Sequence, residues 1–366
     1  MERGARDLVL IGGGHAHALV LLGWKPVPDL RVTLVNPKPA APYTGMLPGH
    51  VAGHYRRSDM MIDLVDLARR AGARLVLDCA TGIDRQAKRV LLAGGDSLPY
   101  DVASLDVGIA SDLPQVPGAA DHAVAAKPLG PYADRWDAFV AQAPAEPQIV
   151  VIGGGTGGIE LAMAQAFRLQ SAGARPRVTV VERAAQVLPG LGAGARQALL
   201  TRMAGFGIRI LTRTEVARIA PDAVILGCGT RLPSDFTLTV TGAQQQAWLT
   251  GTGLALERGF VRVGPTLQSS DPAIFAVGDC AHLSHAPRPK AGVFAVREAP
   301  ILGHNLGAAV LCGPLRRYRP QRDYLKLISC GARVAVADKF GLRLEGAWLW
   351  LWKDRIDRRF MQRFRD

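Results

Sequence analysis

Residues 148–164 read QIVVIGGGTGGIELAMA, and residues 8–17 carry a shorter version of the same pattern, LVLIGGGHAH. In each copy an apolar run leads into three glycines and then into a helical stretch. A second apolar strand follows, RVTVVE at 177–182 and RVTLVN at 31–36. The order strand, glycine turn, helix, strand is typical of the opening of a parallel βαβ nucleotide-binding unit. The sequence therefore predicts two copies of one α/β architecture.

The correspondence continues beyond these units. A later strand of each copy runs from an aspartate to a glycine with the same offset, Asp101 to Gly108 and Asp235 to Gly242. A third apolar strand, ending at Gly278-Asp279, lies beyond the second copy. The simplest layout is therefore a first domain that is interrupted by the second and then resumes.

This layout predicts three portions of the chain. They are a first nucleotide-binding domain of residues 1–125 and 250–318, a second one of residues 126–249, and a small C-terminal α+β portion of residues 319–366 that acts as an interface or cap. The Pro/Ala-rich stretch 141–148 lies near the first crossing, and errors of several residues are expected at each boundary.

The second copy carries the stronger phosphate-binding signal. Gly153, Gly155 and Gly158 fit the spacing GxGxxG, follow a strand and open a helix. Glu182 ends the next strand, where a carboxylate hydrogen-bonds the ribose 2′-OH and repels a 2′-phosphate, which favours NADH. Arg183 beside it leaves NADPH as the less favoured alternative. The competing interpretation is a glycine turn that only packs a helix on a strand.

The first copy departs from the pattern. Gly12 and Gly14 are present, but His17 stands where a glycine normally allows close helix–strand packing, and Asn36 replaces the acid after the second strand. Asn can still bind a ribose hydroxyl, so nucleotide binding is weakened in principle rather than excluded. Asp279 is placed to hold a ribityl hydroxyl, and the helix after it begins where it can face a flavin ring.

Composition limits the class of protein. Of the 366 residues, 48% are hydrophobic and 20% charged, as in a globular protein, and the net charge of +13 favours an anionic partner such as a phosphate-bearing cofactor or a membrane surface. The five cysteines form no CxxC or CxxxxC pair, and no apolar stretch has the length of a membrane span. Because only the residues MERGARD stand before the first strand-like run, we expect no signal peptide. We expect a reduced cytoplasmic protein, at most attached to the inner face of a membrane.

These residues resemble the two-dinucleotide-binding flavoproteins of the pyridine nucleotide-disulfide oxidoreductase superfamily, in which a Rossmann-like FAD domain is split by an inserted NAD(P) domain. The resemblance implies that residues 1–125 and 250–318 form the FAD-binding domain and residues 126–249 the NAD(P)-binding domain. GGGTGGIELA resembles their NAD fingerprint, IFAVGDCA their second FAD motif and FTLTVTGA the strand that closes their NAD domain. Because the CxxxxC motif of the disulfide reductases is missing, the chain resembles the branch of type II NADH dehydrogenases and sulfide:quinone reductases more closely. A narrower resemblance is to an FAD-dependent oxidoreductase group often fused N-terminally to selenide, water dikinase. The segments that carry it are GGGHAH, PYTGMLPGHVAGHY, YDVASLDVG and WKDRIDRRFM.

The resemblance implies hydride transfer from NADH to FAD, with Glu160 beside both rings and Lys290 at the flavin edge as catalytic residues. The residues implied for FAD are Gly12, Gly14, His15, Ala16, Asn36, Pro37, Tyr43, Met46, Leu47, Pro48, Ala80, Gly108, Gly278, Asp279, Gly292 and Val293. Those implied for NAD are Gly153, Gly155, Thr156, Gly157, Gly158, Glu182, Arg183 and Gly242. Segment 43–48 stands where disulfide reductases carry their cysteines, and its apolar residues suit a quinone or another small acceptor.

The acceptor and the partners stay open at this stage. The alternatives to a quinone are a selenium- or sulfur-handling partner or substrate and, in another class, a nucleotide-binding scaffold without turnover. Residues 313–366 hold 14 Lys/Arg against 6 Asp/Glu, and Trp352, Ile356, Phe360 and Phe364 recur every four residues. Segment 346–366 therefore either contacts an anionic membrane or docks on the protein's own core or on a second copy. We expect neither a nucleic acid partner nor a metal site.

Overall fold

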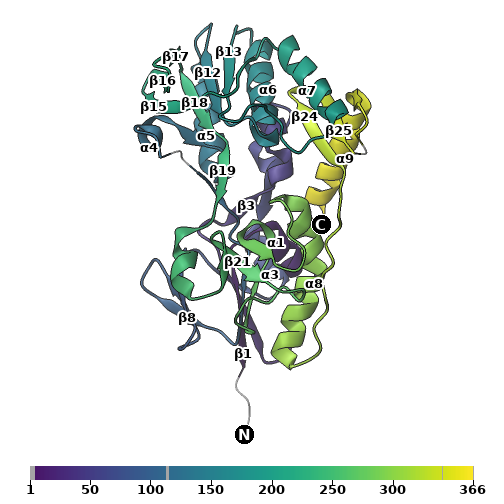
Figure 1. The fold of residues 1–366 in the computed structure, drawn as a ribbon. Coiled ribbons are helices and arrows are strands. Elements are labelled where there is room, and N and C mark those ends of the chain that lie inside the picture. The colour runs from purple at the N-terminus through teal and green to yellow at the C-terminus, as the bar shows by residue number, and fades with distance from the viewer. Residues whose placement is uncertain (1–4, 113–114, 340, 366) are drawn as a thin grey trace.

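The computed structural model describes residues 5–112, 115–339 and 341–365. The lower body in Figure 1 is built on a parallel sheet that takes strands from both ends of the chain. In sheet order these strands are β22 (Ile274–Ala276), β9 (Val102–Leu105), β1 (Arg6–Ile11), β2 (Leu30–Val35) and β5 (Arg74–Val76). Helices α1 (His15–Leu22) and α8 (Gly292–Leu311) pack together, and α8 also contacts β1 and β9. The apolar strand β1 is buried as a result.

The upper body repeats this plan on a second parallel sheet. In sheet order its strands are β11 (Val124–Ala125), β18 (Phe236–Thr239), β12 (Gln148–Ile152), β13 (Arg177–Val181) and β14 (Arg209–Leu211). Helix α6 (Thr156–Ser171) follows β12 as α1 follows β1. Strands β9, β1, β2 and β5 therefore correspond in order to β18, β12, β13 and β14. This confirms the predicted α/β fold with two Rossmann-like bodies.

Shorter elements complete the two bodies. Those between β2 and β9 are β3 (Ala40–Pro42), η1 (Thr44–Met46), α2 (Leu47–Val51), η2 (Arg57–Met60), β4 (Met61–Asp63), α3 (Leu64–Arg70), β6 (Ala80–Asp84), β7 (Arg89–Leu92) and β8 (Ser97–Pro99). Those of the upper body are α4 (Ala119–His122), α5 (Leu129–Ala141), α7 (Ala193–Gly205), β15 (Val216–Ala220), β16 (Ala223–Leu226) and β17 (Arg231–Pro233). Those around β22 are η3 (Ala247–Thr252), β20 (Leu256–Glu257), β21 (Phe260–Val263), η4 (Gly278–Cys280) and β23 (Ala281–Leu283).

Two antiparallel strands connect the bodies. β10 (Ala110–Asp112) follows β9 where the chain leaves the lower body, and β19 (Thr241–Gln244) follows β18 where it returns. The chain then adds β22 to the edge of the lower sheet. β11 already pairs with β18 at residues 124–125, just before the predicted start of the second domain at residue 126. A strand of two residues is too short to give a sequence pattern.

The C-terminal portion bridges the two bodies. Strands β24 (Lys326–Cys330), β25 (Ala332–Asp338) and β26 (Leu344–Gly346) form an antiparallel sheet, and helix α9 (Ala347–Gln362) packs on it. β24 packs against α6 of the upper body. α9, drawn in yellow in Figure 1, runs towards the lower body, where Phe360 stacks on Tyr43 with ring centroids 4.4 Å apart.

The apolar stripe predicted for this helix is split in the structure. Phe360 and Phe364 are buried, but Trp352 and Ile356 are 46% and 45% exposed. A four-residue repeat drifts around a helix that has 3.6 residues per turn, so these side chains cannot all face one way. Part of α9 therefore docks on the protein's own core, and another part faces solvent.

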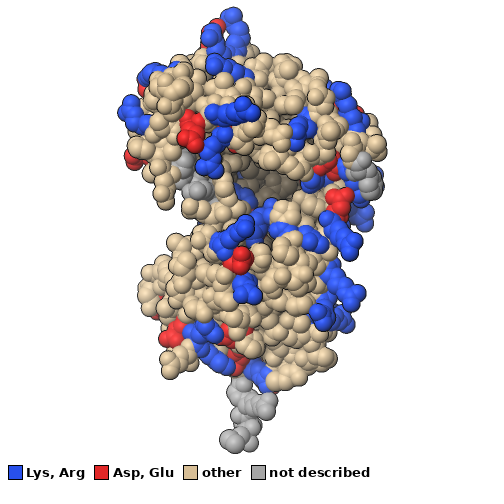
Figure 2. All heavy atoms as spheres, viewed as in Figure 1, with Lys and Arg blue, Asp and Glu red and all other residues tan. Residues whose placement is uncertain are grey.

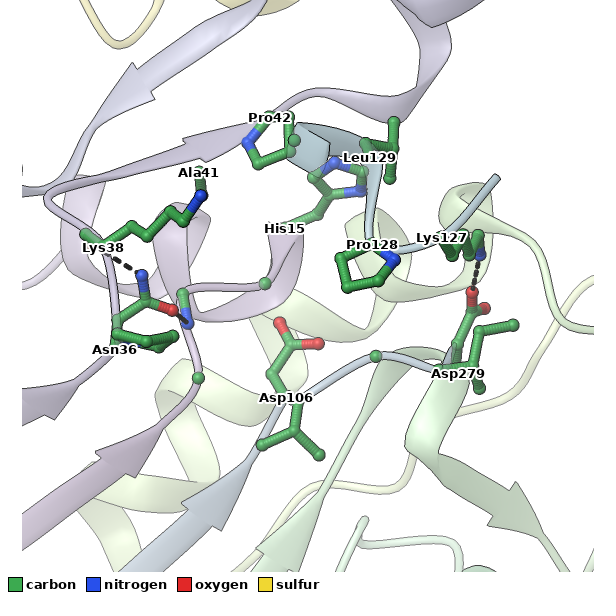
Figure 3. A pocket seen from close by; sticks show the side chains of 18 of the residues that line it. His15, Asn36, Lys38, Ala41, Pro42, Asp106, Lys127, Pro128, Leu129 and Asp279 are labelled. Carbon is green, nitrogen blue, oxygen red and sulfur yellow. Dashed lines mark hydrogen bonds and ion pairs between the residues drawn. The ribbon is translucent and has the colours of Figure 1, made fainter. Parts of the chain in front are cut away.

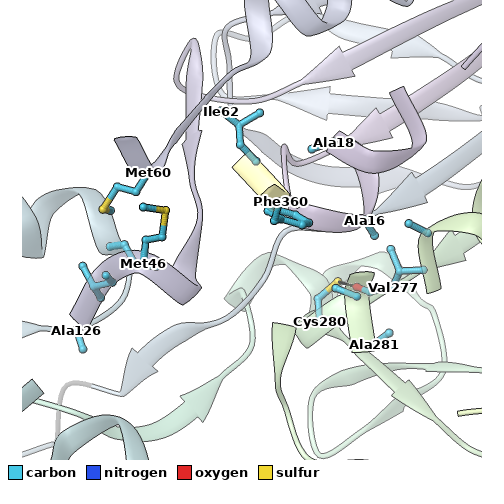
Figure 4. Close-up of a cluster of buried hydrophobic side chains, with 14 of the residues drawn as sticks. Ala16, Ala18, Met46, Met60, Ile62, Ala126, Val277, Cys280, Ala281 and Phe360 are labelled. Carbon is cyan, nitrogen blue, oxygen red and sulfur yellow. Dashed lines mark hydrogen bonds between the residues drawn. The ribbon is translucent and has the colours of Figure 1, made fainter. Parts of the chain in front are cut away.

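The buried cluster of the lower body extends to this docked helix. Figure 4 shows Met46 and Met60 beside Ala126, and Phe360 of α9 near Ala16 at the start of α1. All of these side chains except Phe360 are at most 5% exposed, and Phe360 is 9% exposed. The first glycine turn is thus held between the lower sheet and the C-terminal helix.

Candidate functional site

The turn between β1 and α1 requires glycine at two positions. Gly12 has a φ of +92°, and a Cβ added to it would lie 2.4 Å from the carbonyl oxygen of Asp106. A Cβ added to Gly14 would lie 2.2–2.4 Å from the carboxylate atoms of the same residue. Without these side chains, the turn exposes backbone N–H groups at the start of α1, a cradle that fits a diphosphate.

The second turn has the same construction between β12 and α6. Gly153 has a φ of +116°, and a Cβ on Gly158 would lie 2.0 Å from the carbonyl oxygen of Gly153. A Cβ on Gly155, the residue before the helix, would meet no atom within 4 Å. The N-terminus of α6 is therefore open, and Thr156 and Gly157 form its first positions.

The residue that ends the second strand binds the middle glycine in both copies. Asn36 Oδ1 accepts a hydrogen bond of 2.9 Å from Gly13 N, and its Nδ2 donates to the carbonyl oxygen of Lys38 (Figure 3). Glu182 Oε2 accepts one of 2.7 Å from Gly154 N. The amide of Asn36 thus makes the contact that a carboxylate makes in the other copy, and both side chains lie beside a glycine turn where a ribose binds.

His17 stands where a glycine is usual, and its ring links the start of helix α1 to the strand β9. Its Nδ1 lies 2.7 Å from Gly12 O and its Nε2 lies 2.8 Å from Ser104 Oγ, and the ring is fully buried. Burial lowers the pKa of His17 to about 4, so the ring is neutral at pH 7. The ring thus holds the turn to β9 by two hydrogen bonds that a glycine does not make, and the weaker nucleotide binding expected at this position stays a prediction.

A cavity of about 640 Å³ opens from the first turn towards the upper body. Its walls are formed by Gly12–His15, Val35–Lys38, Ala40–Pro42, Asp78–Ala80, Asp106–Ile109, Lys127–Pro131, Asp279 and Lys290–Gly292, among others. Figure 3 shows His15, Asn36 and Asp106 around it, with Lys127 Nζ 3.1 Å from Asp279 Oδ2 across one side. The cavity is within the size range of cofactor sites and combines an apolar interior with a few polar groups.

Comparison with known proteins identifies the family. Residues 6–299 match the pyridine nucleotide-disulphide oxidoreductase family. The chain belongs to this family. It is an FAD-dependent NAD(P)H oxidoreductase, and the two glycine cradles fit the diphosphates of FAD and of NAD(P)H.

Two relatives by sequence carry different acceptors in their names. Putidaredoxin reductase CamA of Pseudomonas putida is 35% identical over 211 residues, which is 55% of this chain and 48% of that protein. The match therefore spans about half the length of that relative. Demethylphylloquinone reductase NdbB of Synechocystis is 26% identical over 369 residues, 93% of this chain and 88% of that protein.

Two solved structures share the fold over nearly the whole chain. The sulfide:quinone oxidoreductase of Aquifex aeolicus has a TM-score of 0.78 at 20% identity and covers 99% of this chain and 92% of its own. NDH2 of Plasmodium falciparum, solved in complex with NADH, has a TM-score of 0.82 at 14% identity and covers 98% and 97%. At these identities the two structures show the shared fold, and the match to NdbB over 93% of the chain supports the NADH dehydrogenase-like branch that the sequence predicts.

The structure gathers most of the predicted FAD residues around the cavity. Those that line it are Gly12, Gly14, His15, Asn36, Pro37, Ala80, Gly108, Asp279 and Gly292, together with the predicted catalytic Lys290. Ala16, Gly278 and Val293 adjoin lining residues in the chain but are not among them. Their role in FAD binding stays a prediction.

The predicted segment 43–48 lies outside this cavity except for Thr44. Met46 and Leu47 are 1% and 7% exposed, Pro48 is also buried, and Tyr43 lies under Phe360. The sequence suggests an apolar face that is open beside the flavin. In the structure α9 covers part of this face, which the sequence pattern alone does not indicate.

Glu160 lies in the first half of α6 and faces the C-terminal portion. Its Oε1 accepts a hydrogen bond of 2.7 Å from Ser329 N in β24. Burial raises the pKa of the Glu160 carboxyl, and the positive charge of Lys353 acts in the opposite direction. Its predicted place beside both rings stays a prediction.

Lys353, whose charge acts on this carboxyl, is hydrogen-bonded to the segment around Tyr43. Lys353 Nζ donates to Gly45 O and to Asp357 Oδ2, both at 2.7 Å, and the Tyr43 hydroxyl donates to Asp357 Oδ1 at 3.0 Å. Burial raises the pKa of the Asp357 carboxyl. The side chains of Lys353 and Asp357 are only 12% and 5% exposed. α9 thus carries a buried cluster of acid and base groups to the junction of the two bodies.

Lys290 lines the cavity but points its ammonium group at protein. Its Nζ donates to the carbonyl oxygen of Ala281 and lies 4.0 Å from the centroid of the Phe260 ring. Burial lowers its pKa. Its predicted role at the flavin edge stays a prediction.

Sequence reasoning missed several cavity residues. Asp106, Lys127 and Trp248 line the cavity, and no motif singled them out. One feature of the sequence could have indicated Asp106, since it lies two residues before Gly108. Gly108 ends the strand that corresponds to the one ending at Gly242. Lys127 follows β11, a strand too short to be recognised from the sequence.

Cys280, which follows the Gly278-Asp279 motif, carries a buried thiol. Cys280 Sγ donates to the carbonyl oxygen of Val277 at 3.2 Å, and burial raises its pKa to about 12, so the thiol is not ionised at pH 7. Within the described residues, no three or more His, Cys, Asp or Glu side chains are grouped so as to hold a metal ion.

Proposed function

We propose that the oxidoreductase oxidises NADH and delivers the electrons to a quinone. The observation that supports this most directly is segment 43–48, Tyr-Thr-Gly-Met-Leu-Pro, which holds no thiol where disulfide reductases of the superfamily carry theirs. Within the segment Met46 is buried, and Tyr43 stacks on Phe360 of α9. Such surroundings suit a flat, apolar acceptor. The names of demethylphylloquinone reductase and sulfide:quinone oxidoreductase point the same way.

When bound, the two cofactors supply hydride transfer from the nicotinamide to the flavin and electron transfer onward. The residues of this chain then have to exclude water and deliver protons, because a quinone takes up two protons with two electrons. We propose that Glu160, Lys353 and Asp357 handle these protons, because Lys353 Nζ donates to Asp357 Oδ2 in a buried pair and its charge also acts on the buried carboxyl of Glu160. Burial raises the pKa of both carboxyl groups, which favours their protonated forms.

The second cradle supports NADH as the preferred nicotinamide cofactor. Glu182 Oε1 accepts a hydrogen bond from Ala184 N and Oε2 accepts one from Gly154 N, both at 2.7 Å. The carboxylate is therefore held at the place where the adenosine ribose binds in this fold. A 2′-phosphate there meets a fixed negative charge, which the positive charge of the neighbouring Arg183 offsets in part.

We further propose that α9 brings the protein to an anionic membrane surface, where quinones are dissolved. The outer side of α9 exposes Trp348, Leu351, Trp352 and Ile356 at 55%, 61%, 46% and 45%. Arg355 and Arg359 are exposed on the same helix. Apolar side chains flanked by arginines are typical of helices that lie in a membrane interface. Figure 2 shows Lys and Arg outnumbering Asp and Glu around the recess between the two bodies.

The described residues contain no helix that has both the length and the apolar character needed to span a bilayer. Contact with a membrane would therefore be peripheral if it involves the described part of the chain. We propose the cytoplasmic face as its location, in line with the sequence.

Anaerobic titration tests the proposed function. We expect NADH to bleach the visible flavin spectrum and short-chain quinones to restore it, with steady NADH oxidation when both are present. Polysulfide and selenite are the comparison acceptors. The quinone proposal is wrong if NADH bleaches the flavin but quinones do not restore it, while a sulfur or selenium compound does.

Vesicle sedimentation tests the membrane contact. A variant carrying Leu351→Gln, Trp352→Gln and Ile356→Gln changes only exposed side chains of α9. We expect the wild-type protein to sediment with vesicles rich in anionic lipid and the variant to stay in the supernatant. Equal sedimentation of the two proteins contradicts the proposal. Neutral vesicles serve as the control, because they lack the charge that attracts arginine.

A further inference from the structure

Asp106 caps helix α1 from a neighbouring strand. It follows β9, is 4% exposed, and its Oδ2 accepts hydrogen bonds from Ala16 N at 2.8 Å and His17 N at 3.1 Å. These are the second and third N–H groups of the helix, and Gly14 before the helix has no side chain to cap them. The carboxyl group therefore occupies part of the helix N-terminus that faces the cavity.

The fold itself does not require a charge at this position. In the second copy, the offset between Asp235 and Gly242 places Val240 where the first copy has Asp106. The Val240 Cβ is 3.6 Å from a Cβ added to Gly158, so the valine packs on the second turn as an apolar residue. The two copies thus differ in one buried carboxyl beside the diphosphate cradle.

No ion pair to Asp106 is found among the described residues. The groups that face it from α1 are backbone N–H groups and the neutral ring of His17. From η4 it is faced by Asp279, which pairs with Lys127, and by the Cys280 thiol. From α8 it is faced by Glu298, a second buried carboxyl that accepts a hydrogen bond from Gly278 N and is itself influenced by the charge of Lys290. Burial raises the pKa of Asp106 to about 7. Of the charges around it, that of Asp279 also raises the pKa of Asp106.

A diphosphate in the first cradle has to share the helix N-terminus with this carboxyl. The carboxyl atoms lie 2.2–2.4 Å from the position of a Cβ on Gly14, which is the glycine whose missing side chain lets a diphosphate approach. Two anions that share one buried site disfavour each other's ionised form. The carboxylate and the diphosphate therefore cannot both remain charged there without a large cost.

We propose that Asp106 is a residue of the FAD site that takes up one proton from solvent when FAD binds and stays protonated in the holoenzyme. The proton is placed on Oδ1, because Oδ2 already accepts both N–H groups of α1. In this form the carbonyl oxygen continues to cap the helix and the charge is removed. The inference concerns FAD loading and is independent of which acceptor the enzyme uses.

Binding of FAD to flavin-depleted protein tests this, with quenching of flavin fluorescence as the readout. Proton uptake predicts that the dissociation constant for FAD rises by up to tenfold per pH unit above about pH 7. Asp106→Asn keeps a carbonyl oxygen but cannot ionise, so its dissociation constant should be independent of pH in this range and lower than that of the wild type at high pH. A wild-type constant that does not change with pH, or an equal slope in Asp106→Asn, overturns the proposal.

Glu298→Gln is the matched control, because Glu298 is the other buried carboxyl near Gly278 and its pKa is also raised to about 7. The proposal requires the slope to persist in this variant. If the pH dependence of the dissociation constant is lost in Glu298→Gln but not in Asp106→Asn, Glu298 takes up the proton and the role proposed for Asp106 is refuted.

A measurement on the wild-type protein covers the case in which Asp106→Asn does not fold. The infrared difference spectrum between FAD-loaded and flavin-depleted protein above pH 7 should show a new C=O band of a protonated carboxylic acid. Calorimetric titration with FAD in two buffers of different ionisation enthalpy should give uptake of one proton. Absence of the band together with no proton uptake contradicts the proposal.

Discussion

His17 Nε2 lies 2.8 Å from Ser104 Oγ, and this pair stands where the second copy has Gly158 and Leu238. Both residues are fully buried, and the other ring nitrogen lies 2.7 Å from Gly12 O. The ring thus connects the glycine turn to β9. A glycine normally brings helix and strand together by its small size, whereas here hydrogen bonds hold the same elements.

Ser104→Ala is therefore expected to destabilise the protein by about 1–3 kcal/mol, because it leaves a buried ring nitrogen without a partner. The measurement is the free energy of unfolding from urea denaturation followed by circular dichroism. Ser58→Ala, at an exposed serine, is the matched control and should stay within about 0.5 kcal/mol of the wild type. A Ser104→Ala variant as stable as this control contradicts the assigned role.

The free energy of unfolding of the flavin-depleted protein should depend on pH through two kinds of buried group, whose contributions change in opposite directions as the pH falls. His15 and His17 have pKa values lowered to about 4 by burial, so their contribution is present above about pH 6.5 and is lost as the pH falls towards 4. Asp106 has a pKa raised to about 7, so its contribution is present below about pH 4 and is lost as the pH rises to 7. The two effects partly cancel between these limits.

Asp106→Asn removes the second effect and leaves the first. Between about pH 6.5 and 4.5, its free energy of unfolding should therefore fall more steeply with acid than that of the wild type, by up to about 1.4 kcal/mol per pH unit. Urea denaturation of both flavin-depleted proteins at several pH values measures the difference. Parallel curves would show that Asp106 does not bind a proton in the folded state at these pH values.

The sequence predicted the glycine turns and the strand–turn–helix units, because these depend on the backbone conformation of neighbouring residues. Gly12 and Gly153 mark turns because a positive φ and close backbone contacts exclude other residues there, and a strand, a turn and a helix follow one another within about 20 residues. The strand order then repeats, so one recognised copy predicted the other. Cavity residues within these motifs, such as Asn36 and Asp279, were found for the same reason.

Contacts between distant segments could not be predicted in this way. Tyr43 meets Asp357 and Phe360 across more than 300 positions of the chain, and no local pattern couples them. The four-residue repeat in the last helix suggested one apolar stripe, whereas packing on two bodies buries Phe360 and leaves Trp352 exposed. Asp106 was overlooked because a capping carboxyl on another strand has no fixed spacing from the helix it caps.

Glu160→Ala should slow the reduction of flavin by NADH by at least about tenfold, as expected when a buried acid–base group beside the reaction is lost. Anaerobic stopped-flow absorbance measures this step separately from reaction with the acceptor. Glu160→Gln is the informative companion, because its amide oxygen can still accept the hydrogen bond from Ser329 N. A slow Ala variant with a normal Gln variant indicates positioning of β24 rather than acid–base chemistry. Normal rates in both variants remove Glu160 from the site.

Lys353→Ala should loosen α9. It leaves the 5% exposed carboxylate of Asp357 without its cation, a change that typically costs about 3–5 kcal/mol in buried pairs. Hydrogen exchange in residues 347–362 should become faster, and unfolding should begin at lower urea concentration. The matched control is Arg358→Ala, which breaks an ion pair of the same i,i+4 spacing to Asp354 but at a more exposed site, where the loss is at most about 1 kcal/mol. Equal effects of the two variants would contradict the buried linkage between α9 and the lower body.

Glu182→Gln should weaken the preference for NADH over NADPH. The amide oxygen can still accept the hydrogen bond from Gly154 N or Ala184 N, so the turn is expected to keep its shape while its fixed negative charge is lost. Without that charge, the 2′-phosphate of NADPH no longer meets repulsion and can approach Arg183. We expect the ratio of kcat/KM for NADH to that for NADPH to fall by at least about tenfold, mainly through a lower KM for NADPH. Stopped-flow reduction of the flavin at varied concentrations of each nucleotide gives the binding and reaction steps separately. If the ratio is unchanged while NADH still binds normally, the carboxylate does not select the cofactor and Glu182 serves only to hold the glycine turn.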